Sequence, residues 1–159
     1  MTPETLKALL SYDPLSGVFT WRGKPNGRVA HGARAGSAHN KGYRHIRING
    51  RLYLEHVLAV LYTHGVMHDG EIDHINGNRS DNRLENLRRV DKSINLQNQR
   101  KAHKGSASGL LGAHKHGSNW RAVIKIRGER VNIGTFSTAE EAHTAYLKAK
   151  RDLHEGCTI

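Results

Sequence analysis

The residues whose types and spacing could do chemistry lie between positions 71 and 95. Asp73 and His74 end a short apolar stretch, and a polar loop rich in glycine and asparagine follows them. A neutral imidazole can take a proton from water, and carboxylate and carboxamide oxygens are ligands that hard divalent cations such as Mg²⁺ prefer. A helix beginning after Asp91 would turn Asn95 back toward the pair, which makes Asn95 a second candidate ligand.

The charge of the chain indicates what such a site would act on. The 159 residues include 25 Lys and Arg against 14 Asp and Glu, a formal net charge of +11 that is spread along the whole length. Such an excess attracts a polyanion, and phosphate contacts would supply much of the affinity. A basic protein that is merely kept soluble by its charge is the bland alternative. Together with the candidate base and ligands, the charge predicts metal-assisted cleavage of a phosphodiester, with His74 activating water.

Cysteine usage and hydropathy exclude several other classes. The single Cys157 rules out a disulfide framework or a multi-cysteine zinc site and favours a reducing compartment. The chain has no apolar run of about 18 residues and no signal-type apolar core at its start, so we expect a soluble, cytoplasmic protein. His114 and His116 lack matching zinc ligands and are expected near phosphates instead.

The elements that must position these residues follow from periodicity and turn signals. Residues 72–75 and 87–90 are predicted strands joined by the polar loop, and Asp91 is a good N-cap for a helix from residue 92 to about 101. This order is the ββα arrangement. Ahead of it, the sequence predicts a helix at 2–10, a strand at 18–21, an irregular mobile segment at 23–41, a hairpin at 43–54 that turns at Asn49-Gly50, and a helix at 55–64.

The same stretch resembles the HNH endonucleases, also called ββα-metal or His-Me finger nucleases, in the branch found in phage and intron-encoded homing enzymes. The residues that carry the resemblance are Ile72 to Asn78, Asp81-Asn82, Leu84 to Leu87 and Ser93 to Asn98. It extends over much of residues 1–100, through Tyr12-Asp13-Pro14, Gly17 and the strand at Gly42-Tyr43.

The resemblance implies a role for each residue of the candidate site. Asp73 would be a metal ligand, His74 the general base, and Asn86 the central asparagine that braces the loop between the strands. Asn95 would be the second metal ligand, at a position that is histidine in many members. Asn78 and Asn98 are secondary candidates only, and His56 is expected to pack rather than to react.

The C-terminal part is predicted to be a second module. Residues 120–127 and 130–133 alternate as strands with one buried face, and a helix is expected from Ser137–Glu140 to about Leu153. The stretch resembles the DNA-binding domain of plant ethylene-response factors (APETALA-two type) at Gly112, Trp120-Arg121-Ala122, Gly134-Thr135-Phe136, Thr138 to Ala142 and Ala145-Tyr146.

That resemblance implies a three-stranded antiparallel sheet packed on one helix, with the sheet face in the DNA major groove. Arg can read guanine edges, Asn can read adenine, and Lys or Arg can also meet phosphates. Trp120 is expected in the core. Val123 and Asn132 depart from the plant pattern, so the target sequence does not transfer. The residues expected to face DNA are Arg121, Lys125, Arg127, Arg130 and Asn132.

The sequence therefore predicts an α+β fold with a ββα-metal nuclease domain at residues 1–104, its core at about 71–103. A linker at 105–109 and a DNA-binding domain at 110–159 follow. The expected function is a site-recognising, homing-type, phage-encoded DNA endonuclease that uses one divalent ion, Mg²⁺ first and Mn²⁺ next, and acts on double-stranded DNA as a monomer. A non-catalytic DNA-binding protein with a degenerate nuclease fold, and an RNA-binding or RNA-cleaving protein, stay open as alternatives.

Overall fold

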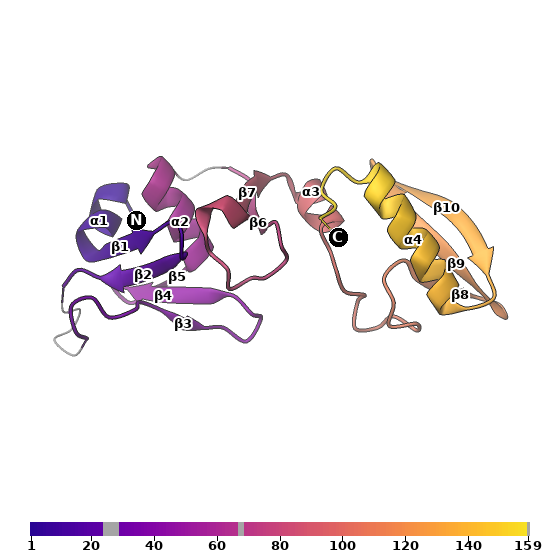
Figure 1. Cartoon of the computed structure of the whole chain (residues 1–159), viewed down its shortest axis with the longest axis horizontal. Coiled ribbons are helices and arrows are strands. Elements are labelled where there is room, and N and C mark those ends of the chain that lie inside the picture. Colours follow the sequence, from indigo (N-terminus) through magenta and orange to yellow (C-terminus); the bar gives the residue numbers. More distant parts are fainter. Residues whose placement is uncertain (24–28, 67–68, 159) are drawn as a thin grey trace. The chain divides into compact units, whose positions relative to one another are not determined.

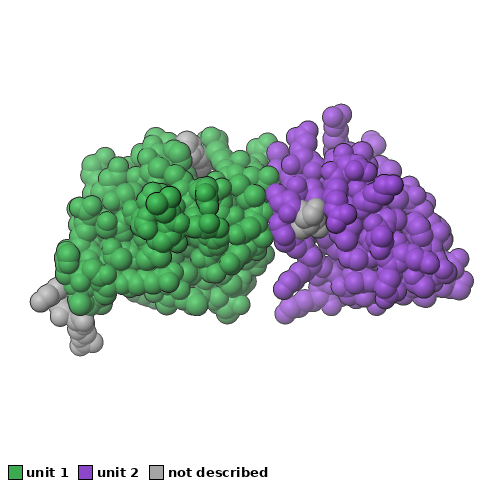
Figure 2. Space-filling view, viewed as in Figure 1, with its two compact units in different colours: residues 1–91 green, residues 92–159 purple. Residues whose placement is uncertain are grey.

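The computed structural model describes residues 1–23, 29–66 and 69–158 of the chain. These residues form two compact units, Met1–Asp91 and Lys92–Ile159, which are coloured separately in Figure 2. Part of the segment predicted to be irregular and mobile, residues 24–28, lies outside the described residues. Within the described ranges, no helix is long and apolar enough to cross a membrane.

The first unit begins with a helix and a β-hairpin. Helix α1 (Pro3–Leu9) starts where predicted, because Thr2 caps it by accepting a hydrogen bond from the Thr5 amide and Pro3 occupies the first turn. Strands β1 (Leu10–Asp13) and β2 (Val18–Trp21) then pair antiparallel (Figure 1). Strand β1 was not predicted, because its residues read as the end of the helix and a turn.

A second hairpin and a helix complete the frame of this unit. Strands β3 (Ser37–Ala38), β4 (Arg44–Ile48) and β5 (Arg51–Leu54) form a sheet in that order. The β4–β5 turn confirms the Asn-Gly prediction, since Asn49 and Gly50 both have positive φ, 49° and 80°. Helix α2 (Glu55–His64) follows directly and spans the predicted residues. The short strand β3 and the buried Ala35 show that residues 29–41 are more ordered than the sequence predicted.

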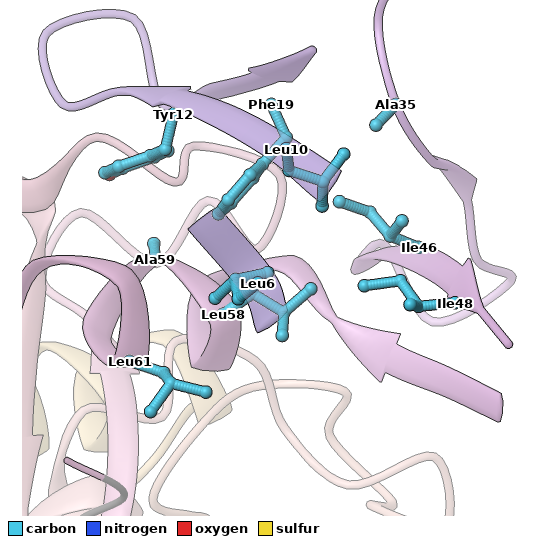
Figure 3. Packing of buried hydrophobic residues seen from close by; sticks show 10 residues of the cluster. All are labelled: Leu6, Leu10, Tyr12, Phe19, Ala35, Ile46, Ile48, Leu58, Ala59 and Leu61. Carbon is cyan, nitrogen blue, oxygen red and sulfur yellow. The ribbon is translucent and has the colours of Figure 1, made fainter. Parts of the chain in front are cut away.

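The core of the first unit lies between α1, α2 and the two hairpins (Figure 3). The Tyr12 and Phe19 rings stack with centroids 4.7 Å apart, and Leu6, Leu10 and Leu58 close around them. Each fully buried leucine contributes about 1.5–3 kcal/mol relative to an exposed one. This packing fixes the hairpin β1–β2 against α2, which matters for the site below.

Two further strands carry the candidate chemistry. Strand β6 (Glu71–His74) pairs antiparallel with β7 (Leu87–Val90), and the 3₁₀ turn η2 (Leu84–Asn86) leads into β7. The predicted strands are thereby confirmed to within one residue. Asp73 stands directly opposite Arg88 in the register.

The second unit begins with the short helix α3 (Lys92–Gln97), which ends before the predicted residue 101. Residues at the end of α3 and just after it contact the last described residues: the Gly156 amide donates to Gln97 Oε1 (2.9 Å), and Arg100 Nη2 donates to the Thr158 carbonyl oxygen (2.8 Å). These contacts place α3 in the second unit, so the two compact units divide at 91/92 rather than in the glycine-rich stretch 105–109. The boundary predicted at residues 105–109 separates functional domains, and the division into compact units does not test it, so it stays a prediction.

The rest of the second unit is a three-stranded antiparallel sheet packed on one helix. Strands β8 (Ala113–His116), β9 (Asn119–Ile126) and β10 (Glu129–Phe136) lie in the order β10-β9-β8, and α4 (Ala139–Leu153) covers one face. Thr138 and Glu141 form a capping box at the start of α4. The sheet and the helix therefore have the arrangement expected from the sequence.

Candidate active site

Asp73 and His74 lie side by side at the end of β6, and both are buried, at 8% and 3% exposure. Because Asp73 faces Arg88 across the β6–β7 pair, Arg88 Nη2 and Nε both donate to Asp73 Oδ2, at 2.9 and 3.1 Å. The Asp73 charge is therefore partly balanced by a guanidinium that the sequence did not single out.

The His74 ring lies in a small aromatic cluster. The His56 ring stands edge-on at 5.0 Å between centroids, and Tyr43 lies at 6.0 Å. Burial lowers the pKa of His74, while its hydrogen bond with Asn82 and the charge of Asp73 act in the opposite direction. His74 is therefore held in its neutral form, which is the form a general base needs.

A chain of hydrogen bonds leads from His74 into the interior of the first unit. His74 Nε2 lies 3.1 Å from Asn82 Oδ1, and Asn82 Nδ2 donates to Glu55 Oε2 at 2.9 Å. Arg44 Nε donates to both carboxylate oxygens of Glu55 at 3.1 Å. Asn82 and Glu55 are each 1% exposed. Burial raises the pKa of Glu55, and Arg44 opposes that shift.

The local fold explains why a carboxylate is buried here. Glu55 is the first residue of α2, immediately after β5, and Arg44 starts the adjacent strand β4. Gly36 leaves room for the pair, since a Cβ at this position would lie 2.4 Å from Glu55 Oε1. The two partners of the ion pair thus come from the second hairpin and the helix that follows it, and Asn82 of the β6–β7 loop contacts the pair.

Asn86 holds the polar loop together. Its Oδ1 accepts from the Asn76 amide (2.9 Å), and its Nδ2 donates to the Asp81 carbonyl oxygen (2.8 Å). Hydrogen bonds from Arg83 help to lower the pKa of Asp81 to about 2, so this carboxylate stays charged. These are the contacts that a loop-bracing residue makes, and they touch the loop rather than a reacting group.

The N-terminal hairpin also holds this loop. The Tyr12 hydroxyl donates to the Asn82 carbonyl oxygen (2.7 Å), and the Leu84 amide donates to the Pro14 carbonyl oxygen (3.1 Å). Gly17, at φ 71°, lies so close to this loop that a Cβ there would be 2.4 Å from the backbone nitrogen of Arg83. Residues around positions 12–17 therefore fix the backbone that presents Asn82.

The donor set suits a hard cation at Asp73. Mg²⁺ usually takes one or two protein oxygens and keeps several waters, so a cluster of acidic residues is not required. No group of three or more His, Cys, Asp or Glu that could hold a metal occurs within residues 1–23, 29–66 and 69–158. Asn95 lies on α3, in the second unit, and its pairing with Asp73 stays a prediction.

The two secondary candidates have local structural contacts. Asn78 Oδ1 accepts from the Ser80 amide (3.1 Å) and hydroxyl (2.9 Å) within the polar loop. Asn98 is buried and accepts a hydrogen bond from the Thr158 hydroxyl. Both side chains are explained by these contacts, and neither needs a role as ligand.

In the second unit, the sheet face opposite α4 carries most of the residues expected to contact DNA. Ala122 and Ile124 point into the core, so their neighbours on β9 point the other way. The register then places Arg130 beside Lys125 and Asn132 beside Val123 on β10. Arg121, Lys125, Arg130 and Asn132, here called the basic sheet face, therefore lie on one side. The Trp120 ring packs against the core, as expected.

One of the five predicted contact residues lies elsewhere. Arg127 is not on a strand, because β9 ends at Ile126 and Arg127 forms the β9–β10 turn with φ 49°. Two histidines that the sequence analysis expected near phosphates lie beside this face. His114 stands opposite Arg121 in the register, and His116 Nε2 lies 2.6 Å from Arg121 Nη2. The period-two spacing of the two histidines was the signal that could have placed them there.

One segment of the chain matches a known protein family, and this segment includes the candidate active site. Residues 53–97 match the family described as HNH endonuclease, and these 45 positions include Asp73, His74, Asn86 and Asn95. No curated protein matches the chain. A solved structure, described as DNA binding and cleavage by the HNH homing endonuclease I-HmuI, is similar with a TM-score of 0.49 and 18% identity over 98% of this chain and 93% of that chain. The chain thus contains a segment, residues 53–97, that matches the HNH endonuclease family.

Proposed function

We propose that the protein is a metal-dependent, site-recognising DNA endonuclease of the homing type. The observation that carries the proposal is the buried Asp73-His74 pair at the end of β6, inside the segment that matches the HNH endonucleases. A carboxylate next to a neutral imidazole supplies one cation ligand and one proton acceptor, which are two groups that metal-assisted phosphodiester hydrolysis can use. The net charge of +11 favours a polyanionic substrate.

Each of the candidate residues has its own role in the proposed reaction. His74 takes the proton of the attacking water through a ring nitrogen, and burial keeps the ring neutral. Asp73 and Asn95 would hold one divalent cation, Mg²⁺ or Mn²⁺, which neutralises the scissile phosphate and the departing oxygen when bound. Asn86 keeps the loop between β6 and β7 in shape. The products would be 5′-phosphate and 3′-hydroxyl ends.

DNA would be held by the second unit through the basic sheet face. Lys125, Arg130 and Asn132 are exposed there, and Arg121 is half-buried beside them. Side chains of these types contact phosphates and base edges in the major groove. A module like the DNA-binding domain of ethylene-response factors would contribute site recognition to the nuclease. A phage origin would fit this combination.

One observation favours a second candidate, a DNA-binding protein that has lost catalysis. The Arg88 guanidinium donates two hydrogen bonds to Asp73 Oδ2, so Arg88 competes with a cation for that oxygen. The hydrolytic proposal requires Asp73 to keep enough negative charge to attract a divalent ion beside Arg88.

Plasmid cleavage separates the two candidates. We expect the purified full chain to cut supercoiled DNA with Mg²⁺ or Mn²⁺ and to stop when the metal is chelated. His74→Ala should cut about 10²–10⁴-fold more slowly while still binding DNA in a gel-shift assay. His31→Ala, at an exposed histidine of the first unit, is the matched control and should cut normally. Undiminished cutting by His74→Ala would refute the assigned base, and a wild type that stays inert with either metal would favour the non-catalytic candidate.

A further inference from the structure

The chain from His74 to Arg44 contains one link whose orientation can be deduced. A carboxylate only accepts hydrogen bonds, and Glu55 Oε2 lies 2.9 Å from the side-chain nitrogen of Asn82. That contact is possible only when the Asn82 amide turns its NH₂ group toward Glu55. The carbonyl oxygen of the same amide must then face His74 Nε2, at 3.1 Å.

The state of Glu55 supports this orientation. Arg44 Nε lies 3.1 Å from both carboxylate oxygens, so the charged form gains a charge-assisted contact. Glu55 is 1% exposed, and a buried charge of this kind is tolerated because it is paired and hydrogen-bonded. The Arg44–Glu55 pair therefore imposes a direction on Asn82 that a neutral environment would not impose.

The amide oxygen of Asn82 can only accept, so the proton of the neutral His74 ring must lie on Nε2. The lone pair then lies on Nδ1. We propose that Asn82, oriented by Glu55 and Arg44, is a positioning residue that fixes the His74 tautomer, so that Nδ1 is the nitrogen that receives the proton from water. This inference rests on the proposed function for its catalytic meaning, whereas the tautomer itself is a property of the folded protein.

The backbone contacts of Asn82 make it a rigid support. Its carbonyl oxygen accepts from the Tyr12 hydroxyl, and Gly17 packs against the Asn82–Arg83 peptide. These contacts hold the backbone of Asn82, and the contact of its amide nitrogen with Glu55 directs the side-chain oxygen at His74. Removal of the partner that orients a metal-binding histidine typically changes activity by about 10–100-fold, and we expect an effect of similar size at His74.

Nitrogen-15 NMR of the metal-free full chain tests the tautomer directly. At about pH 8, where His is neutral, the proton of His74 should be found on Nε2, with the signal assigned by comparison with His74→Gln. In Glu55→Gln the new amide can donate or accept, so Asn82 can take either orientation and the Nδ1–H form should appear as well. Glu85→Gln is the matched control, because Glu85 forms an exposed ion pair with Arg83 and should leave the tautomer unchanged.

Cleavage kinetics supply the second readout. Asn82→Leu keeps the backbone contact with Tyr12 and should lower kcat by about 10–100-fold with little change in the KM for DNA. A proton on Nδ1 of wild-type His74 would overturn the proposal. So would a Glu55→Gln protein with an unchanged tautomer and unchanged turnover. A wild-type protein that cuts no DNA would reject the proposed function instead, and the NMR result would still decide the orientation of Asn82.

Discussion

The buried His56 should make the first unit sensitive to acid. Its side chain is 5% exposed and packs against the rings of Tyr43 and His74. Burial, with a smaller contribution from His74, lowers the pKa of His56 from 6.5 to about 4. The unfolded chain therefore binds a proton near pH 6.5 that the folded chain does not accept until near pH 4. The free energy of unfolding therefore has its full value above pH 6.5 and decreases as the pH falls toward 4, because the unfolded chain binds a proton that the folded chain excludes.

The size of the effect follows from the pKa difference. A change of one pKa unit corresponds to about 1.4 kcal/mol, so the shift of His56 from 6.5 to about 4 amounts to about 3 kcal/mol below pH 4. At about pH 5 the folded ring is still mostly neutral, and the loss at that pH is about 2 kcal/mol. Replacing His56 with phenylalanine removes the titrating group and keeps an aromatic ring in the cluster.

The two tryptophans make the measurement specific to one unit. Trp21 packs against the core of the first unit, and Trp120 against the core of the second. In a Trp120→Phe background, urea unfolding followed by tryptophan fluorescence reports the first unit alone. Between about pH 7.5 and pH 5, the wild type should lose about 2 kcal/mol more than His56→Phe.

Any strain from the larger phenyl ring should change stability equally at both pH values, so the comparison uses only the difference between them. His31→Gln, at an exposed position, should retain the wild-type loss. If His56→Phe and the wild type lose the same free energy between the two pH values, burial of a neutral His56 is not the cause, and the reasoning fails.

Four other substitutions test three contacts that lie within one unit or the other and one proposed contact with DNA. Tyr12→Phe removes the donor to a buried carbonyl and should cost the first unit about 1–2 kcal/mol in urea unfolding. Gly17→Ala adds a Cβ 2.4 Å from the Arg83 nitrogen at a positive φ, so its thermal transition should fall by the equivalent of about 1–3 kcal/mol or more. Thr138→Ala breaks the capping box of α4 and should destabilise the second unit by about 1 kcal/mol in urea. Arg121→Gln should reduce the salt dependence of DNA binding by about one counterion, measured by fluorescence anisotropy across a salt series.

Two of these outcomes have a matched comparison. Gly50→Ala also places a side chain at positive φ, but nothing lies within 4 Å of its Cβ, so it separates backbone strain from the overlap at Gly17. Tyr53→Phe is the comparison for Tyr12→Phe. Equal losses in either pair would contradict the assigned contacts. A salt dependence that Arg121→Gln leaves unchanged would remove that residue from the DNA interface.

The elements that the sequence predicted well are those with a local signal. Asn49-Gly50 determines its own turn, and alternating apolar residues determine β9, because both depend on neighbours in the chain. Strand β1 was missed because Leu10 and Tyr12 follow α1 directly and become a strand only through pairing with β2. Helix α3 was predicted too long because its end depends on contacts with residues near position 156.

The candidate site divides in the same way. Asp73, His74 and Asn86 could be found because they form a compact motif in the sequence. Glu55 could not, because its burial depends on Arg44 and on Asn82, which is 27 positions away. A glutamate at the start of a helix ordinarily faces solvent and stabilises the helix terminus. Only the assembled hairpins show that this one is enclosed.

The grip of the first hairpin on the Asn82 loop has a practical consequence for dissecting the protein. A peptide trimmed to the family-matching stretch, residues 53–97, would keep Asp73 and His74 but would lack Tyr12, Gly17 and Arg44. The loop that carries Asn82 would lose its contacts with Tyr12 and Gly17, and Glu55 would lose its ion pair with Arg44. The smallest piece worth expressing on its own therefore starts at the beginning of the chain, although Asp73 and His74 lie much later in the sequence.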